Sequence, residues 1–300
     1  MGFNFLSGFV QSHEFARVIA QDDELLAADV NHSLIMKWNE ADQEWSYFDL
    51  DWIATRLWVM FEPNIQLFAT GPAGIVSVVT AQDDNEEMID DSPEGPCGHG
   101  DIRDLRLIGE HLYVTGMGRQ VYRRDGLNKW SRQDMGLVQP LGTLEVSGLN
   151  AIDGLNESDI YAVGFGGEIW RYKENKWCQN DSPTNLVLHC VRVIRSDLVY
   201  ASGQAGILLR GYGNIWESIE HDATDEDLWG MEWFNGKLYV TCDDGLFVLT
   251  DSDKLKKADM GLGDSWTCRH LHANDGVMWS FGPKHLAWTE DGKKWIDVTP

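Results

Sequence analysis

At 300 residues, with 43% hydrophobic and 24% charged residues, the chain has enough apolar material for a large core, which excludes a mainly disordered protein. Its 48 acidic residues against 24 basic ones give a net charge of −24, and no run of Lys or Arg forms a basic stripe, so nucleic acid is a poor partner. The N-terminus lacks a basic secretion signal, no stretch approaches the roughly 20 apolar residues that span a bilayer, and the five cysteines lack CxxC spacing, so we expect a cytoplasmic protein with reduced thiols and without a cofactor.

A five-residue pattern recurs along the whole chain and reads large apolar, aromatic, small, β-branched or small, then Gly in most copies. Successive copies lie 42, 45, 48, 39, 39 and 40 residues apart, close to the spacing of four short strands plus turns. Seven such units predict an all-β fold, a seven-bladed β-propeller with four-stranded antiparallel blades, as a single domain over residues 1–300. The copies are Leu25–Asp29, Leu67–Gly71, Leu112–Gly116, Ile160–Gly164, Val199–Gly203, Leu238–Cys242 and Met278–Gly282.

The repeat also sets the expected blade boundaries, which are about 11–50, 51–94, 95–135, 146–182, 187–222, 227–260 and 264–300. In five blades a Trp stands near the start of the outer strand, where its ring is expected to fill the gap between blades toward the rim. The second and sixth blades lack it, and residues 1–10 either add an extra strand or pack against the ring. These tryptophans are Trp45, Trp130, Trp177, Trp216 and Trp295.

Two turns carry a family resemblance. Residues Thr289–Trp295 resemble the Asp-box, a turn with Ser or Thr, then Asp, Gly and Trp, and Arg123–Trp130 is a weaker version. Similar repeats occur in sialidases, sortilin-type receptors and the propeller-shaped photosystem II assembly factor, so the resemblance implies a fold and no particular function. We expect Asp125 and Asp291 to be turn formers.

No catalytic or metal motif is complete in the sequence. A sialidase would need three arginines clasping a carboxylate, and Arg192, Arg195 and Arg269 do not stand in that family's motif. His270 and His272 share one face of a strand-like segment, with His189 in the corresponding region two blades earlier. Such residues more often sit in the channel lining or in the core with hydrogen-bond partners than bind a metal. We therefore expect no catalytic residue and no metal site.

Two acid-rich segments are expected to be loops entering a blade, one before the third blade and one before the sixth. Because entering loops share one face in propellers of this resemblance, we expect both segments on one rim, with Met88, Ile89, Leu228 and Trp229 exposed beside them. A basic partner would relieve the repulsion between the acids. The predicted partner-binding residues are Asp83, Asp84, Glu86, Glu87, Asp90, Asp91, Glu217, Glu220, Asp222, Asp225, Glu226, Asp227 and Trp229, with Glu94 close by.

Three hypotheses about function follow. In the first, the chain is a non-enzymatic protein, monomeric when free, whose acidic face binds a basic protein; its sharpest version is an immunity protein that blocks a bacterial toxin, for example a nuclease, by charge mimicry. In the second it is an assembly or scaffolding factor, and in the third a glycan-binding or glycoside hydrolase-like propeller. The acidity could also serve solubility alone.

Overall fold

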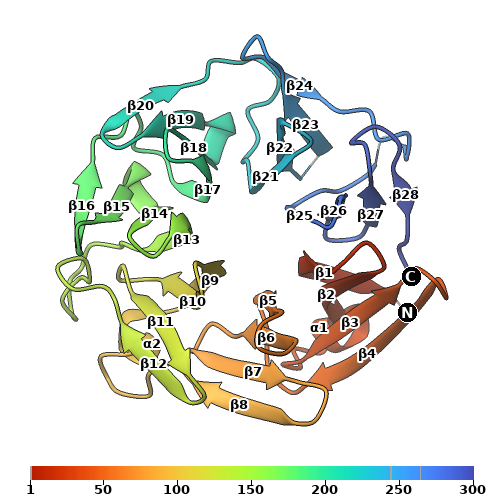
Figure 1. The fold of residues 1–300 in the computed structure, drawn as a ribbon, viewed down its shortest axis with the longest axis horizontal. Coiled ribbons are helices and arrows are strands. Elements are labelled where there is room, and N and C mark those ends of the chain that lie inside the picture. The colour runs from red at the N-terminus through yellow and green to blue at the C-terminus, as the bar shows by residue number, and fades with distance from the viewer. Residues whose placement is uncertain (1, 244, 264) are drawn as a thin grey trace. The chain divides into compact units, whose positions relative to one another are not determined.

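The structure is a computed structural model that describes residues 2–243, 245–263 and 265–300. Seven four-stranded antiparallel sheets follow one another along the chain, and they are the blades of a β-propeller, which confirms the predicted fold class (Figure 1). Within each sheet, strands adjacent in sequence are adjacent in space. The chain divides into two compact units, residues 1–59 with 221–300 and residues 60–220, and each is described by itself below.

The first three blades end before residue 133. The first contains β1 (Phe3–Val10), β2 (Phe15–Asp22), β3 (Ser33–Asn39) and β4 (Glu44–Leu50). The second contains β5 (Arg56–Met60), β6 (Gln66–Thr70), β7 (Ile75–Val79) and β8 (Asp84–Met88). The third contains β9 (Ile102–Ile108), β10 (His111–Gly116), β11 (Val121–Gly126) and β12 (Lys129–Arg132). Two short helices accompany them, α1 (Asp23–Ala27) and α2 (Pro96–His99).

The last four blades complete the series. The fourth contains β13 (Leu149–Asn156), β14 (Asp159–Gly164), β15 (Ile169–Lys173) and β16 (Lys176–Asn180). The fifth contains β17 (Leu188–Arg195), β18 (Leu198–Gly203), β19 (Leu208–Tyr212) and β20 (Ile215–Ser218). The sixth contains β21 (Gly230–Phe234), β22 (Lys237–Cys242), β23 (Gly245–Leu249) and β24 (Leu255–Lys257). The seventh contains β25 (His270–Asn274), β26 (Val277–Phe281), β27 (Leu286–Thr289) and β28 (Ile296–Asp297), and the 3₁₀ turns η1 (Phe165–Gly167) and η2 (Gln204–Gly206) follow β14 and β18.

Six of the seven copies of the repeat lie in the second strand of a blade or at its end. These strands are buried almost throughout, as in β18 and β26, which agrees with a pattern that packs on both faces. The first copy is the exception, because Leu25–Asp29 overlaps α1, while the second strand of the first blade is β2. Asp22 explains the error: its carboxylate accepts hydrogen bonds from the backbone N–H groups of Glu24 and Leu25, so it caps a helix.

The N-terminal residues form a strand rather than a packed extension. Strand β1 pairs with β2, so the first sheet begins at Phe3 and not near residue 11 as expected. Strand β1 also contacts the seventh blade, since the Val10 N–H donates to His272 Nδ1 at 3.1 Å and the Phe5 N–H donates to the Pro283 carbonyl at 2.9 Å. At Gly8 a side chain would clash with the Phe281 ring, about 2.1 Å from the position of a Cβ atom. The first and last blades therefore pack as two complete sheets.

Polar bonds connect the innermost strands of neighbouring blades. In residues 60–220, Asp104 accepts from the Ile152 N–H at 3.0 Å, and Asp153 accepts from the Val193 N–H at 2.8 Å. In the other unit Glu232 accepts from the Ala273 N–H at 3.3 Å. A carboxylate on one inner strand thus satisfies a backbone donor on the next, as buried donors require.

Three of the outer-strand tryptophans, Trp45, Trp130 and Trp177, donate hydrogen bonds to the neighbouring blade, whereas Trp216 donates to Gly213 of its own hairpin. The indole of Trp177 donates to the Gln133 carbonyl at 2.7 Å, at the end of the third blade. The indole of Trp45 donates to the Val298 carbonyl at 2.9 Å, at the end of the seventh blade. The apolar core accordingly lies between blades, for example between the third and fourth through Tyr113, Ile152 and Trp177.

The Asp-box-like turns differ from one another. Asp291 is a turn former, because one carboxylate oxygen accepts from the N–H groups of Lys293 and Lys294, both at 2.8 Å. Asp125 instead accepts from the Arg123 side chain at 2.8 Å. No helix among the described residues is long and apolar enough to cross a membrane.

Candidate binding surface

The first acidic segment, residues 83–94, lies at the outer edge of the second blade. Asp84–Met88 form β8, which pairs with β7, so the expectation of a loop is wrong for these residues. Pairing with an apolar strand outweighs the low strand propensity of Asp and Glu. The segment nevertheless exposes most of its acids, and charged residues on an outermost strand discourage pairing with another sheet. The exposed acids are Asp83, Asp84, Glu86, Asp91 and Glu94.

Glu87 is the exception within this segment, because its side chain is fully buried. It pairs with Arg124 of the third blade, with N–O distances of 2.6 and 2.9 Å, and accepts from the Asn128 N–H and the Trp130 indole. Burial alone would raise the pKa of Glu87, but these bonds and the charge of Arg124 outweigh it and lower the pKa below its usual value. Glu87 fastens two blades, and its expected place in an exposed loop is wrong.

Asp90 and its neighbours show a similar division of roles. The Asp90 side chain is half-buried and accepts from the Ser92 N–H at 3.0 Å, at the start of the connection that leads through α2 into β9. Met88 is exposed as expected, whereas Ile89 is buried. Within this segment the exposed surface is therefore acidic, and Met88 is its one exposed large apolar residue.

The second acidic segment, residues 217–227, starts in β20 and continues toward β21. Glu217 accepts from Arg210 on the adjacent strand at 2.7 Å, and both Glu217 and Glu220 are exposed. In the other unit Leu228 is fully buried, so it is not the exposed anchor that the sequence suggested. Among the remaining acids of the second segment, Asp222, Asp225 and Glu226 are exposed and Asp227 is half-buried. The expectation that the two acidic segments share one face stays a prediction.

Trp229 lies beside an arginine that is already paired. The Arg269 guanidinium is 4.8 Å from the centre of the Trp229 ring, within the range of a cation–π contact. Arg269 also pairs with Asp243 at 3.0 Å. Trp229 and Arg269, together with Arg56, line a hollow of about 260 Å³. Trp229 is half-buried there, and its role in partner binding stays a prediction.

The histidines and arginines singled out in the sequence have different surroundings, and His270, His272 and Arg192 connect neighbouring blades. His272 accepts from Val10, and His270 Nε2 lies 3.1 Å from the Gly8 carbonyl, so both connect β25 to β1. Arg192 pairs with Asp153 and Arg195 with Asp197, at 3.7 and 2.7 Å. His189 lies in β17. Within the described ranges, no group of three or more His, Cys, Asp or Glu side chains could hold a metal ion.

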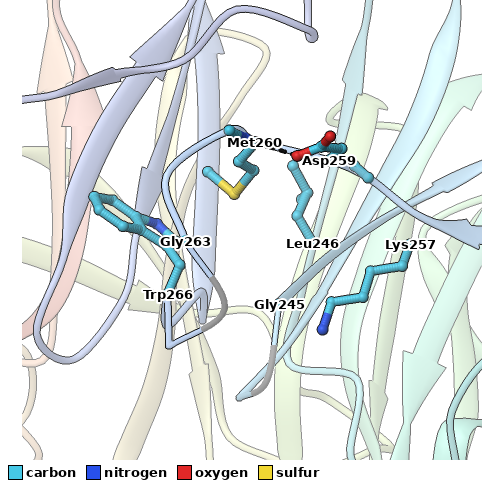
Figure 2. A pocket seen from close by; sticks show the side chains of 9 residues that line it. Gly245, Leu246, Lys257, Asp259, Met260, Gly263 and Trp266 are labelled. Atoms are coloured by element: carbon cyan, nitrogen blue, oxygen red, sulfur yellow. Dashed lines mark hydrogen bonds between the residues drawn. The ribbon is translucent and has the colours of Figure 1, made fainter.

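A cavity of about 470 Å³ opens at the sixth blade, between the start of β23 and the connection after β24 (Figure 2). Its Trp266 stacks on His285, with ring centres 4.4 Å apart, and Asp259 accepts from the Gly261 N–H at 2.9 Å. Asp259 is the one carboxylate among the described residues that line it, whereas glycoside hydrolysis usually needs two. The described part of its lining therefore contains no pair of carboxylates.

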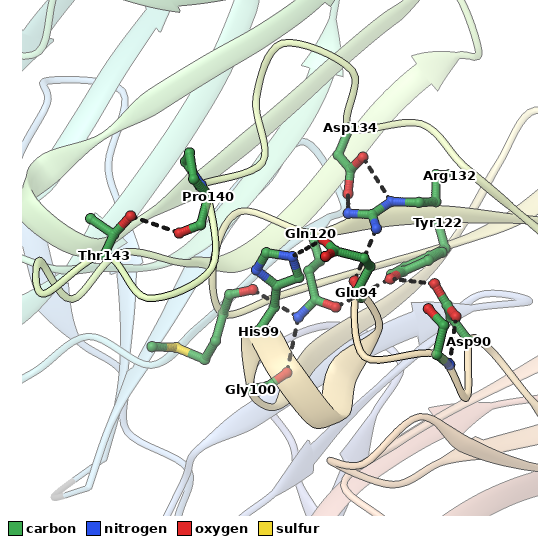
Figure 3. Close-up of polar contacts among 12 residues, drawn as sticks. Asp90, Glu94, His99, Gly100, Gln120, Tyr122, Arg132, Asp134, Pro140 and Thr143 are labelled. Carbon is green, nitrogen blue, oxygen red and sulfur yellow. Dashed lines mark hydrogen bonds and ion pairs between the residues drawn. The ribbon is translucent and has the colours of Figure 1, made fainter.

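One prominent surface feature was absent from the predicted site. The connection between β12 and β13, residues 133–148, is called the tip loop here. It exposes several large apolar side chains. Figure 3 shows two other residues of this loop, Pro140 and Thr143, together with His99 and Glu94 from the end of the first acidic segment and its continuation. Its length was visible in the sequence as the longest gap between repeats, and long loops without secondary structure are usually functional or disordered. The exposed apolar residues are Met135, Leu141, Leu144 and Val146.

Comparison with solved structures shows which proteins share the fold of this chain. The chain matches no model of a known protein family. The structure is similar to the WD40 propeller domain of Doa1, with a TM-score of 0.71 and 8% identity over 93% of this chain and 90% of that one. It is also similar to YCF48 bound to D1 peptide, with a TM-score of 0.58 and 16% identity over 77% of each chain. Identities this low show the fold alone.

A close relative is far more informative. The "Immune protein Tsi7" of Pseudomonas aeruginosa is 37% identical over 304 aligned positions, which cover 99% of this chain and 97% of the relative. The match runs through every blade, the connections between blades and both acidic segments, so it extends well beyond a shared repeat. The chain belongs to the Tsi7 family of immune proteins.

Proposed function

We propose that this chain is an immunity protein that neutralises a bacterial protein toxin by binding it, without catalysing a reaction. The observation that carries the proposal is the full-length similarity to an immune protein. The rigid architecture supports it as well, because bonds between blades leave the connections on a fixed frame, where they can be presented to a partner.

The partner that best fits this surface is a basic protein. A net charge of −24 attracts a basic protein and speeds its encounter with the chain. The exposed acids of β8 and of the connection after β20 are placed to meet such a partner, whereas Glu87 is not. The same charge disfavours self-association, so the chain is expected to be monomeric when free, and we place it in the cytoplasm.

Survival of cells that make the toxin tests the proposal. The probe is the protein encoded beside this gene, expressed from an inducible promoter in Escherichia coli with or without this chain. Growth should stop when the neighbouring gene's product is made alone. It should recover when that product and this chain are made together. Cells that die equally in both cases, although the chain is soluble and abundant, would contradict the immune role.

Stoichiometry distinguishes binding from catalysis. An inhibitor that acts by binding protects only when it is at least equimolar with the toxin, so titrating the purified chain against the purified neighbour should abolish toxic activity near a ratio of about one. The neighbour should be recovered chemically unchanged, by intact-mass measurement. Full protection by a small fraction of an equivalent, or a change in mass, would instead indicate an enzyme.

A further inference from the structure

The tip loop is the longest connection between two blades, and it contains neither helix nor strand. Leu144 is 99% exposed and Val146 is 68% exposed, and Leu141 beside them is also exposed. Apolar side chains scattered singly on a surface are ordinary, but three of them within six residues form a local patch. Connections of this length in compact folds are usually functional or disordered.

The base of the tip loop is held firmly. The Gly118 N–H donates to the Ser147 carbonyl and the Gln139 N–H donates to the Gly118 carbonyl, both at 2.9 Å, so both ends of residues 140–146 are tied to one residue. Leu137 is buried in the core between the third and fourth blades. Within the loop, the Thr143 hydroxyl donates to the Pro140 carbonyl at 2.6 Å. The exposed patch is therefore presented by an ordered loop.

The loop lies against the end of the first acidic segment. A Cβ atom on Gly98 of α2 would lie 3.3 Å from Leu141, so α2 and the loop are in close contact. His99, the next residue of α2, has a buried ring whose Nε2 atom lies 3.7 Å from a carboxylate oxygen of Glu94 (Figure 3). Gln120 braces this region by donating to the carbonyls of Gly100 and Met117.

Two carboxylates accompany the apolar patch. Glu145 lies within the loop between Leu144 and Val146, and its charge contributes to the raised pKa of Arg119. The guanidinium of Arg119 forms its ion pair with Glu168. Glu94 is exposed and lies beside His99, at the end of the first acidic segment. The loop thus combines exposed apolar side chains with nearby carboxylates. This resembles protein interfaces in which an apolar centre is surrounded by a polar rim.

We propose that the tip loop is a docking site for the toxin, with Leu144 and Val146 entering an apolar recess that Lys or Arg side chains border. This inference rests on the proposed function and adds which surface makes the contact. The acids favour a basic toxin over a second copy of this chain, because two copies would bring Glu94 and Glu145 against like charges. Burying these two exposed side chains in such a recess would remove apolar surface from water, which favours association.

The test measures binding of the neighbouring gene's product, the same probe as above, to purified variants by calorimetry. Leu144→Ser and Val146→Ser should each weaken binding by at least about tenfold, because each removes a large apolar side chain whose burial would favour binding. Leu155→Ser is the matched control: Leu155 is 44% exposed and lies near the end of β13 that is farther along the chain from the tip loop, so this variant should bind like the wild type. Circular dichroism melting should show all three variants to be folded.

The outcomes separate the two proposals. Binding by the wild type and equal binding by the Leu144 and Val146 variants would overturn the docking site and leave the immune function intact. Failure of the wild type to bind would overturn both. A wild-type chain that sediments as a dimer, and a Leu144→Ser variant that sediments as a monomer, would show that a second copy occupies the loop instead.

Discussion

Glu87 shows how one residue can belong to an acidic segment and yet have a different role from its neighbours. Asp84 and Glu86 are exposed on the same strand, but Glu87 is buried and makes two bonds to Arg124. Strand alternation explains part of this, since neighbouring side chains point to opposite faces. The sequence could not reveal it, because Arg124 stands in the next blade and nothing local marks it as the partner.

Replacing this carboxylate should destabilise the fold. Glu87→Gln leaves the mostly buried Arg124 without its counter-charge, and breaking such a pair costs about 3–5 kcal/mol. Urea unfolding at pH 7 measures the loss. Asp84→Asn on the same strand is the control and should change the free energy of unfolding by less than about 0.5 kcal/mol. Equal effects of the two changes would contradict the buried role of Glu87.

The pH dependence of stability should change with the same substitution. The pKa of Glu87 is lower in the folded protein than its ordinary value of 4.5, so the carboxylate stabilises the fold above about pH 4.5. That contribution is lost as the pH falls from 4.5 through the lower folded value. The gap in unfolding free energy between wild type and Glu87→Gln should therefore be widest at neutral pH and narrow in acid. A constant gap would show that the charge is not responsible.

At the scale of elements, the repeat predicts most of the second strands correctly. It does not predict the short helix α1 or the tip loop. Six copies occupy second strands because a strand buried on both faces has a distinctive composition, as in Leu198–Gly203. The copy at Leu25–Asp29 matched by composition alone, although Asp22 and the acids after it are typical of a helix start. The tip loop was overlooked because the prediction of a binding surface followed charge and not exposed apolar residues.

The N-terminal strand provides a test at this scale. Removing residues 1–10 would delete β1 and uncover apolar residues of β2 and the seventh blade, among them Val18, Trp279 and Phe281. The shortened chain should fail to fold, seen as insolubility or as loss of the cooperative thermal transition. A soluble shortened chain that melts at the temperature of the full chain would show that β1 is dispensable, as an extension that merely packs would be.

At the scale of the whole molecule, composition alone predicted the class of partner, and the relative supports an immune role. The net charge is a property of the entire chain, so it could be read without knowing the fold. The net charge does not show which acidic side chains are exposed to a partner. The structure excludes Glu87, keeps Asp83, Asp84, Glu86 and Asp91 exposed, and places the tip loop beside the end of this segment.

Charge reversal of the exposed acids should act on binding alone. Changing Asp83, Asp84, Glu86 and Asp91 to Lys, while keeping Glu87, should reduce affinity for the neighbouring gene's product by at least about tenfold and slow its association, because steering depends on these charges. Surface plasmon resonance gives both rates. Unchanged rates in this folded variant would remove the first acidic segment from the binding surface.

The account as a whole depends on attraction between this acidic chain and a basic toxin. The most direct measurement is the dissociation constant of the wild-type complex, determined by calorimetry as the salt concentration is raised. Because the screening length falls from about 10 Å at 0.1 M to about 3 Å at 1 M, we expect affinity to fall by at least about tenfold over that range. A dissociation constant that does not change with salt would contradict recognition by charge.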